Sequence, residues 1–140
     1  MFGNSKSVAS TYAQLDLEGR VEAADPHGLI QMLFDGAIVA VGQAEALVAS
    51  GDVAGKGVAT SRAIRIIEEG LRASLDVKQG GPLAAQLRDL YQYMSYRLLM
   101  ANLKNDAGGF AEVKKLLGDL KGAWTRIKPQ VARPPLAAVK

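Results

Sequence analysis

The chain has no cysteine, and His27 is the only histidine among its 140 residues. Without thiols it forms no disulfide, thiolate nucleophile or thiolate metal site, and a single imidazole excludes a histidine-rich metal site. No apolar run approaches the roughly 20 residues that a membrane-spanning helix needs. The first residues, MFGNSKSVASTYAQ, lack the apolar centre of a secretory signal. We therefore expect a cytosolic (cytoplasmic) protein that does not insert into a membrane.

A basic excess is also missing from the body of the chain, although the formal net charge is +3. Residues 128–140 carry Lys128, Arg133 and Lys140 and no acid, which leaves fourteen basic and fourteen acidic side chains in residues 1–127. A domain that binds nucleic acid needs a concentrated basic face to neutralise phosphates. The sequence therefore predicts no nucleic-acid partner.

The residues that catalysis or cofactor binding would need are also lacking. His27 follows the helix-starting Pro26, so we expect it to be a solvent-exposed group rather than a catalytic base. Asp35 lies in an otherwise apolar stretch, where we expect it to bond to a neighbouring element. Gly80-Gly81 is not followed by the Lys-Ser/Thr pair of a phosphate-binding loop. We predict that the protein is not an enzyme and has no catalytic residue, metal site or cofactor.

Helical periodicity divides the middle of the chain into four segments of similar length. Each segment starts with a capping aspartate or a proline, namely Asp25-Pro26, Asp52, Pro82 and Asp106. The predicted helices cover residues 25–49, 53–75, 82–104 and 107–127. Similar lengths and short turns favour antiparallel neighbours. We therefore predict an all-α fold, an antiparallel up-down four-helix bundle over residues 25–127.

Two segments flank the predicted bundle. Residues 1–24 have interrupted apolar positions, and we expect them to pack loosely on the bundle as an N-terminal capping segment through Tyr12 and Leu15. Residues 128–140 contain Pro129 and Pro134-Pro135, which end regular structure. We predict that they form a disordered, Pro-rich C-terminal tail, to which the sequence assigns no role.

The third predicted helix has more apolar residues than one core stripe needs. Its core face comprises Leu83, Leu87, Leu90, Met94, Leu98 and Ala101, and further apolar side chains lie on the opposite half of the helix. The second helix adds a weaker patch, Ala59, Ala63, Ile66 and Ala73. A small monomer seldom exposes a large apolar patch without a partner, and an interhelical groove often binds an amphipathic peptide. We predict such a binding groove between the two helices, lined by Ile66, Tyr93, Tyr96, Leu99, Met100 and Leu103.

Two other uses of these side chains stay open at this point. Adjacent helices of the bundle could share them in the core, because bundle helices bury about half of their girth. Alternatively, two copies of the chain could pair through them as a homodimer. The second use would make the protein a self-associating helical bundle with a structural or regulatory role.

Several motifs follow one another in order along residues 11–127. They comprise Tyr12-Ala13-Gln14, the run DPHGLIQMLFDGAI at 25–38, RAIRIIEEGL at 62–71, RLLMANLKND at 97–106, and Trp124. This ordered set resembles the signature of the flagellar secretion chaperone family, FliS. The sequence departs from the family pattern at Phe34, which stands where a tyrosine is frequent, and in the tail from Pro129.

The resemblance implies an antiparallel four-helix bundle that binds the disordered C-terminal segment of flagellin in the bacterial cytosol. Such binding masks a segment that would otherwise polymerise prematurely, and it presents the cargo to the export gate of the flagellar type III secretion apparatus. The resemblance implies no nucleotide or metal. By position, docking to the export gate falls on Tyr12.

Overall fold

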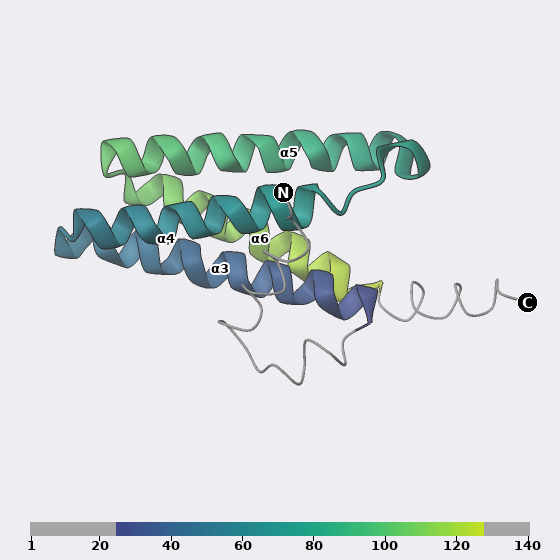
Figure 1. Cartoon of the computed structure of the whole chain (residues 1–140), viewed down its shortest axis with the longest axis horizontal. Helices are drawn as coiled ribbons and strands as arrows, with labels where there is room; N and C mark the ends of the chain where they lie inside the picture. Colours follow the sequence, from purple (N-terminus) through teal and green to yellow (C-terminus); the bar gives the residue numbers. More distant parts are fainter. Residues whose placement is uncertain (1–24, 128–140) are drawn as a thin grey trace, which may run out of the picture.

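The computed structural model describes residues 25–127, and all regular structure within them is helical. The elements are α3 (Pro26–Ser50), α4 (Val53–Arg65), the π-helix η1 (Ile66–Arg72), α5 (Val77–Lys104) and α6 (Ala107–Arg126). In Figure 1, α3 and α5 run in one direction and α4 and α6 in the other, so consecutive helices are antiparallel. The predicted all-α bundle is confirmed, whereas the predicted N-terminal cap and Pro-rich tail lie outside the described residues.

Side chains at the helix ends explain most of the boundaries. The Asp25 carboxylate accepts the Gly28 N–H at 2.7 Å at the start of α3, and Asp52 accepts the Gly55 N–H at 2.9 Å at the start of α4. Both bonds satisfy N–H groups that have no partner within the helix. At the end of α5, Asn105 adopts a left-handed conformation with φ 54°. This conformation stops the helix, as the sequence predicts.

Helix α5 begins earlier than the predicted start at Pro82. The Asp76 carboxylate accepts the Gln79 N–H at 3.0 Å, which caps a first helical turn from Val77. Gly81 then interrupts the helix with φ 60° and ψ −140°, a backbone conformation that favours glycine. The capping aspartate therefore adds a short turn before the main helix.

The second predicted helix, residues 53–75, is in fact two pieces, α4 and η1. The change to π-helical geometry starts at Ile66, where η1 lies against α3. At Gly70 the approach is so close that an added Cβ would lie 2.7 Å from Cδ2 of Leu33. The π-helix widens each turn and turns Ile66, Ile67 and Leu71 all into the core.

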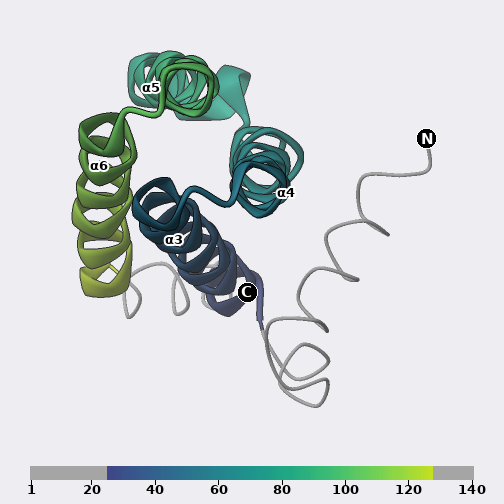
Figure 2. The same cartoon turned by 90° about the vertical axis from the view of Figure 1, so that its left-hand side faces the viewer.

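Figure 2 shows α3, α4, α5 and α6 arranged around a common centre. Their inward side chains form one apolar core. Its largest fully buried side chains are Phe110, Ile67, Leu71, Met94, Leu98 and Leu117. Helix α3 packs against both α4 and α6. By length and hydropathy alone α3 could cross a membrane, contrary to the expectation that no apolar stretch is long enough, and 44% of its most apolar 18-residue window is buried inside the fold. In this fold the apolar character of α3 serves the core of the bundle.

His27 and Trp124 join the start of α3 to the end of α6. Their rings stack with centroids 4.6 Å apart and an angle of 8° between planes. His27 Nε2 donates to the Trp124 carbonyl at 2.8 Å, and Trp124 Nε1 donates to the His27 carbonyl at 3.0 Å. His27 is only 2% exposed, so the prediction of a solvent-exposed histidine is wrong. The reason is that α6 ends on this first turn of α3 and covers the ring.

Hydrogen bonds and an ion pair made by polar side chains connect two other pairs of helices, α4 with α5 and α3 with α6. The ammonium of Lys56, a buried residue of α4, donates to the Asn102 carbonyl at 2.8 Å and to Asn105 Oδ1. The negative end of the α5 dipole stabilises a cation there. Asp35 forms an ion pair with Lys121 of α6 at 2.5 Å. The expectation that Asp35 bonds to a neighbouring element is therefore confirmed.

Candidate functional site

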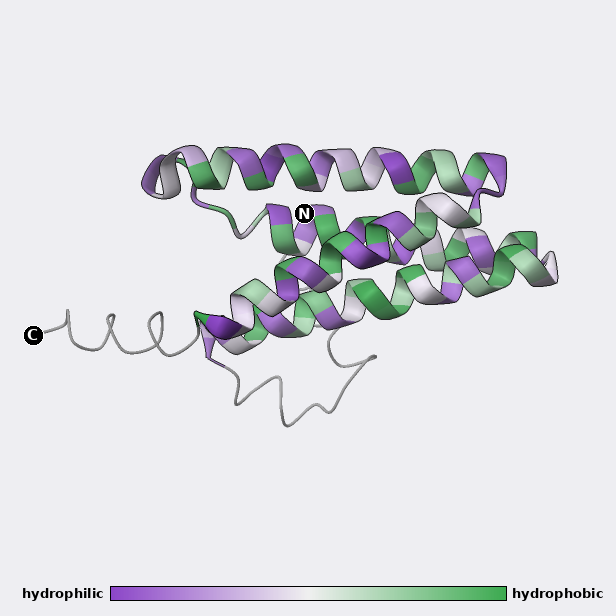
Figure 3. Ribbon diagram, turned by 180° about the vertical axis from the view of Figure 1, so that it is seen from behind, coloured by the Kyte–Doolittle hydropathy of each residue, from purple (hydrophilic) through white to green (hydrophobic). Residues whose placement is uncertain are grey.

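Five of the six residues predicted to line a groove form one apolar surface on α5. This outer stripe consists of Tyr93, Tyr96, Leu99, Met100 and Leu103. Leu103 is 67% exposed, Tyr96 60%, Leu99 48% and Tyr93 42%, while Met100 is half-buried. At 100° per residue the stripe points away from the core residues Met94 and Leu98. Figure 3 shows apolar residues recurring along α5 between polar ones.

Ile66 does not belong to this surface. The structure places it in the core and not in a groove with α5. The residue is only 3% exposed and is part of the core cluster. The π-helical geometry of η1, together with the close approach at Gly70, turns it inward. The other members of the second-helix patch that lie in α4, Ala59 and Ala63, are buried as well. The outer stripe therefore lies on α5 alone.

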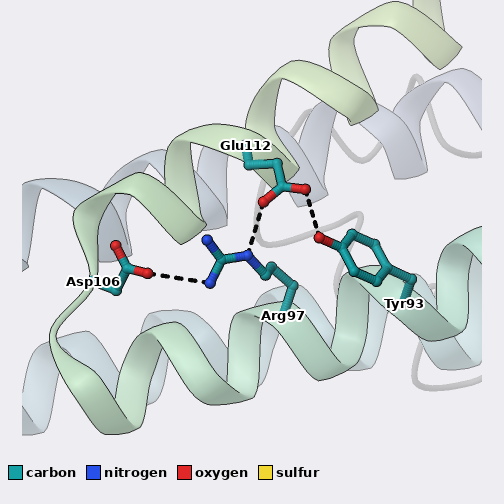
Figure 4. A network of polar contacts seen from close by, with 4 residues as sticks. All are labelled: Tyr93, Arg97, Asp106 and Glu112. Atoms are coloured by element: carbon teal, nitrogen blue, oxygen red, sulfur yellow. Dashed lines mark hydrogen bonds and ion pairs between the residues drawn. The ribbon is translucent and has the colours of Figure 1, made fainter.

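A polar network borders the outer stripe on the side of α6 (Figure 4). Tyr93 Oη donates to Glu112 Oε2 at 2.6 Å, and Arg97 Nε donates to Glu112 Oε1 at 2.8 Å. Arg97 also bonds to Asp106 Oδ2 at 3.2 Å. The hydrogen bonds from Tyr93 and Arg97 lower the pKa of Glu112. The hydrogen bond to Glu112 raises the pKa of Tyr93. The hydrogen bond to Glu112 thus fixes the position of the Tyr93 ring beside α6.

A second polar group lies on the opposite flank of α5. Ser95 Oγ donates to Glu68 Oε2 at 2.6 Å, and Arg72 donates to the other oxygen of Glu68 at 2.6 Å. These bonds join α5 to η1, as the Tyr93 network joins α5 to α6. The outer stripe therefore lies on a helix that is fixed along both sides, and its exposed side chains are presented on a rigid support.

An apolar cleft of about 890 Å³ opens on the inner side of α5, at the end of the bundle where α3 starts and α6 ends. Its volume lies in the range of about 300–1,000 Å³ that ligand pockets occupy. None of the six predicted groove residues lines it. Its apolar walls include Ile30, Phe34, Leu71, Leu75, Leu83, Leu87, Tyr91, Leu120, Trp124 and Ile127.

Sequence reasoning missed this cleft because it placed Leu83 and Leu87 in the core. Leu83 is 65% exposed in the structure, and Leu87 is half-buried. Figure 1 shows why: at this end of the bundle α5 runs apart from α3 and α6. The available signal was the gathering of large apolar residues at helix ends, such as Leu75, Leu83 and Ile127. Periodicity alone does not report how far helices diverge.

The other sequence-based site predictions have different outcomes. Tyr12 and Leu15, the predicted cap and docking residues, lie outside the described residues. Within residues 25–127, no group of three or more His, Cys, Asp or Glu side chains lies close enough to hold a metal ion. Tyr91 of the cleft is buried, which raises its pKa to about 12. Its phenol is thus neutral at physiological pH.

The fold is an all-α helical bundle with two apolar surfaces, the outer stripe of α5 and the cleft at the end where α3 starts. The sequence model of the family described as "Flagellar protein FliS" matches residues 8–131 of this chain. The chain therefore belongs to the FliS family of flagellar secretion chaperones, and the resemblance seen in the sequence is confirmed.

Several relatives are similar over nearly the whole chain. The flagellar secretion chaperone FliS of Salmonella typhimurium is 49% identical over 126 residues, which cover 90% of this chain and 93% of the relative. FliS of Escherichia coli is 40% identical over 127 residues, covering 89% and 93%. FliSB of Pseudomonas aeruginosa is 40% identical over 116 residues, covering 83% and 91%. Membership of this family supports a role as an export chaperone in flagellum biogenesis.

Proposed function

We propose that this protein binds the C-terminal segment of flagellin in the bacterial cytoplasm, prevents its premature polymerisation and presents it to the flagellar type III export apparatus. The observation that carries the proposal is the outer stripe of α5, whose large apolar side chains face solvent. Such a surface is what a member of a secretion chaperone family would use to bind its cargo. The proposed activity is binding alone, without a catalytic step, a cofactor or a nucleic-acid partner.

The stripe suits an amphipathic helix of the cargo. Residues 93–103 rise about 15 Å along α5, which corresponds to nearly three helical turns. A cargo helix whose apolar residues follow the pattern i, i+3, i+4, i+7 and continue to about i+10 presents a stripe of the same length. Tyr96 and Leu103 would make its largest contacts because they are the most exposed members of the stripe.

The energetics require a contact longer than the stripe. Ordering one residue of a disordered segment costs about 1–2 kcal/mol of backbone entropy. At about 25 cal/mol per Å² of apolar area, the offset takes roughly 40–80 Å² of buried apolar surface per residue. Residues 93–103 of α5 do not offer this much apolar surface to every residue of a long cargo segment. The cargo must therefore also bury apolar surface elsewhere on the bundle.

The test is a Tyr96→Glu substitution, assayed by co-purification with flagellin and by titration with a peptide of its C-terminal segment. A buried tyrosine at a hot spot contributes about 2 kcal/mol or more, so we expect the affinity to fall at least tenfold. Helical content should stay native, because Tyr96 is exposed. Gln86→Glu adds the same charge to an exposed site on α5 outside the stripe and should leave the affinity unchanged. Equal affinity in both variants would remove the outer stripe from the site.

Self-association is the competing use of the same stripe. Light scattering of the chain without cargo, over a range of concentrations, distinguishes the two. A monomer at all concentrations supports the cargo site. A homodimer that Tyr96→Glu dissociates, combined with unchanged flagellin binding, would instead assign the stripe to pairing of two copies.

A further inference from the structure

The cleft is a second apolar surface, separate from the outer stripe, and its walls are suited to a particular kind of occupant. Trp124 of α6 is a half-buried aromatic wall of the cleft, and the edges of the buried Phe34 of α3 and Tyr91 of α5 also line it. Aromatic-lined grooves bind proline-rich segments in extended conformation, because such segments are partly pre-ordered and lose less entropy on binding. An apolar wall also favours proline for a second reason. A proline has no backbone N–H that burial would leave without a partner.

The chain supplies a segment of this kind at the edge of the cleft. Ile127, which lines the cleft, is the last residue that the structure describes. It is followed by KPQVARPPLAAVK, residues 128–140, which contains three prolines and the apolar residues Val131, Leu136 and Val139. Fully extended, thirteen residues reach roughly 40 Å. We propose that the Pro-rich segment 129–139 folds back and occupies the cleft of its own molecule.

Charge favours this segment over the other end of the chain. Asp76 is the one carboxyl side chain among the residues that line the cleft, which include no Lys, Arg or His, and among the described residues it forms no ion pair. The segment 128–140 has three basic side chains and no acid, whereas residues 1–24 have two basic and three acidic ones. A cation beside Asp76 is attracted, and an acidic segment is repelled.

Family membership does not supply this contact, since the family match ends at residue 131 and leaves residues 132–140 outside it. The contact is also separate from the outer stripe, none of whose residues lines the cleft. Tail docking is measured in the chain without cargo, so its test is separate from the Tyr96→Glu test of flagellin binding. Docking would order part of a segment that its composition alone predicts to be flexible.

Trp124 provides the assay, because it is the only tryptophan of the chain and it lines the cleft. We compare the full chain with a chain that ends at Lys128, measuring tryptophan emission and quenching by acrylamide. Removal of residues 129–140 should shift the emission to the red and at least double the quenching constant. It removes no described residue, so the helical content should stay the same. A synthetic peptide of residues 129–140 should reverse the change at about millimolar concentration, which a short tether supplies within one molecule.

An Asp76→Asn substitution tests the charge separately. Asparagine still caps α5 by accepting the Gln79 N–H, so the helix start is preserved. In the full chain the substitution should increase quenching of Trp124, and in the chain that ends at Lys128 it should have no effect. An equal effect in both chains would mean that Asp76 acts on the fold and not on the tail.

Three outcomes overturn the proposal. Truncation at Lys128 could leave Trp124 fluorescence unchanged, in which case the tail does not fill the cleft. Deletion of residues 1–20 could expose Trp124 while truncation does not, in which case the N-terminal segment is the occupant. Quenching that decreases as protein concentration rises, in the full chain, would assign the cleft to a second copy. Each outcome leaves the flagellin-binding test with Tyr96→Glu valid.

Discussion

A His27→Ala substitution would remove most of the contact that holds the start of α3 to the end of α6. It deletes the ring that stacks on Trp124 and the donor to the Trp124 carbonyl. The stack contributes about 0.5–1.5 kcal/mol and the hydrogen bond about 1 kcal/mol, and the lost burial adds to both. We expect unfolding to become easier by about 2–3 kcal/mol. For a bundle of this size that corresponds to a melting temperature lower by roughly 10–15 °C.

A His27→Phe substitution separates the two contributions. Phenylalanine keeps a ring in the stack but leaves the Trp124 carbonyl without its donor. It also removes His27 Nδ1, a buried atom that has no hydrogen-bond partner within the described residues. The expected loss is about 1 kcal/mol, half or less of the loss in His27→Ala.

Urea unfolding followed by circular dichroism measures both variants. Gln31→Ala, one turn further along α3 at a half-buried position, is the matched control and should change stability by less than about 0.5 kcal/mol. If His27→Ala is as stable as the control, the stacked pair does not hold the helix ends together. If the two His27 variants lose the same stability, the ring stack contributes nothing.

Three further substitutions test other parts of the molecule. Gly70→Ala places a Cβ 2.7 Å from Leu33 Cδ2, so we expect a loss of about 1–3 kcal/mol in thermal unfolding; a more stable variant would contradict the close approach. The folded-state pKa of Glu112 is lowered, so its contribution to stability is present above the ordinary glutamate range and is lost as the pH falls through the lowered pKa. Arg97→Gln should therefore reduce the stability lost on acidification, measured by urea unfolding at a series of pH values, and an unchanged pH dependence would oppose this. Tyr12→Ala should leave flagellin binding intact and reduce export, assayed as secreted flagellin; weaker binding would assign Tyr12 to the wrong step.

Most local features of the fold could be predicted from the sequence, although Asp106, predicted to cap α6, makes no side-chain capping hydrogen bond. Asp25 and Asp52 each cap the helix that the sequence assigns to them, and Asn105 takes the left-handed conformation expected of it. These features depend on a few neighbouring residues, so a short stretch of sequence is enough to define them. The exposed position of Tyr96 and Leu103 also followed from periodicity, because a residue opposite the core stripe of a straight helix faces outward.

The features that were missed depend on contacts between distant segments. Nothing in the sequence around Ile66 indicates the π-helix η1, which packs closely on α3 at Gly70. His27 is buried because Trp124, at the far end of the described chain, packs on it. The cleft arises from the divergence of α5 from α3 and α6, a property of the packed bundle that no single helix contains.

The central claim is that the outward apolar side chains of α5 form the contact with flagellin. Residue-resolved NMR of the unmodified chain, titrated with a peptide of the flagellin C-terminal segment, measures this without any substitution. The account predicts saturable shifts of the side-chain signals of Tyr96, Leu99 and Leu103, with smaller changes in the core residue Met94. Binding that leaves all three outward side chains unshifted would contradict it.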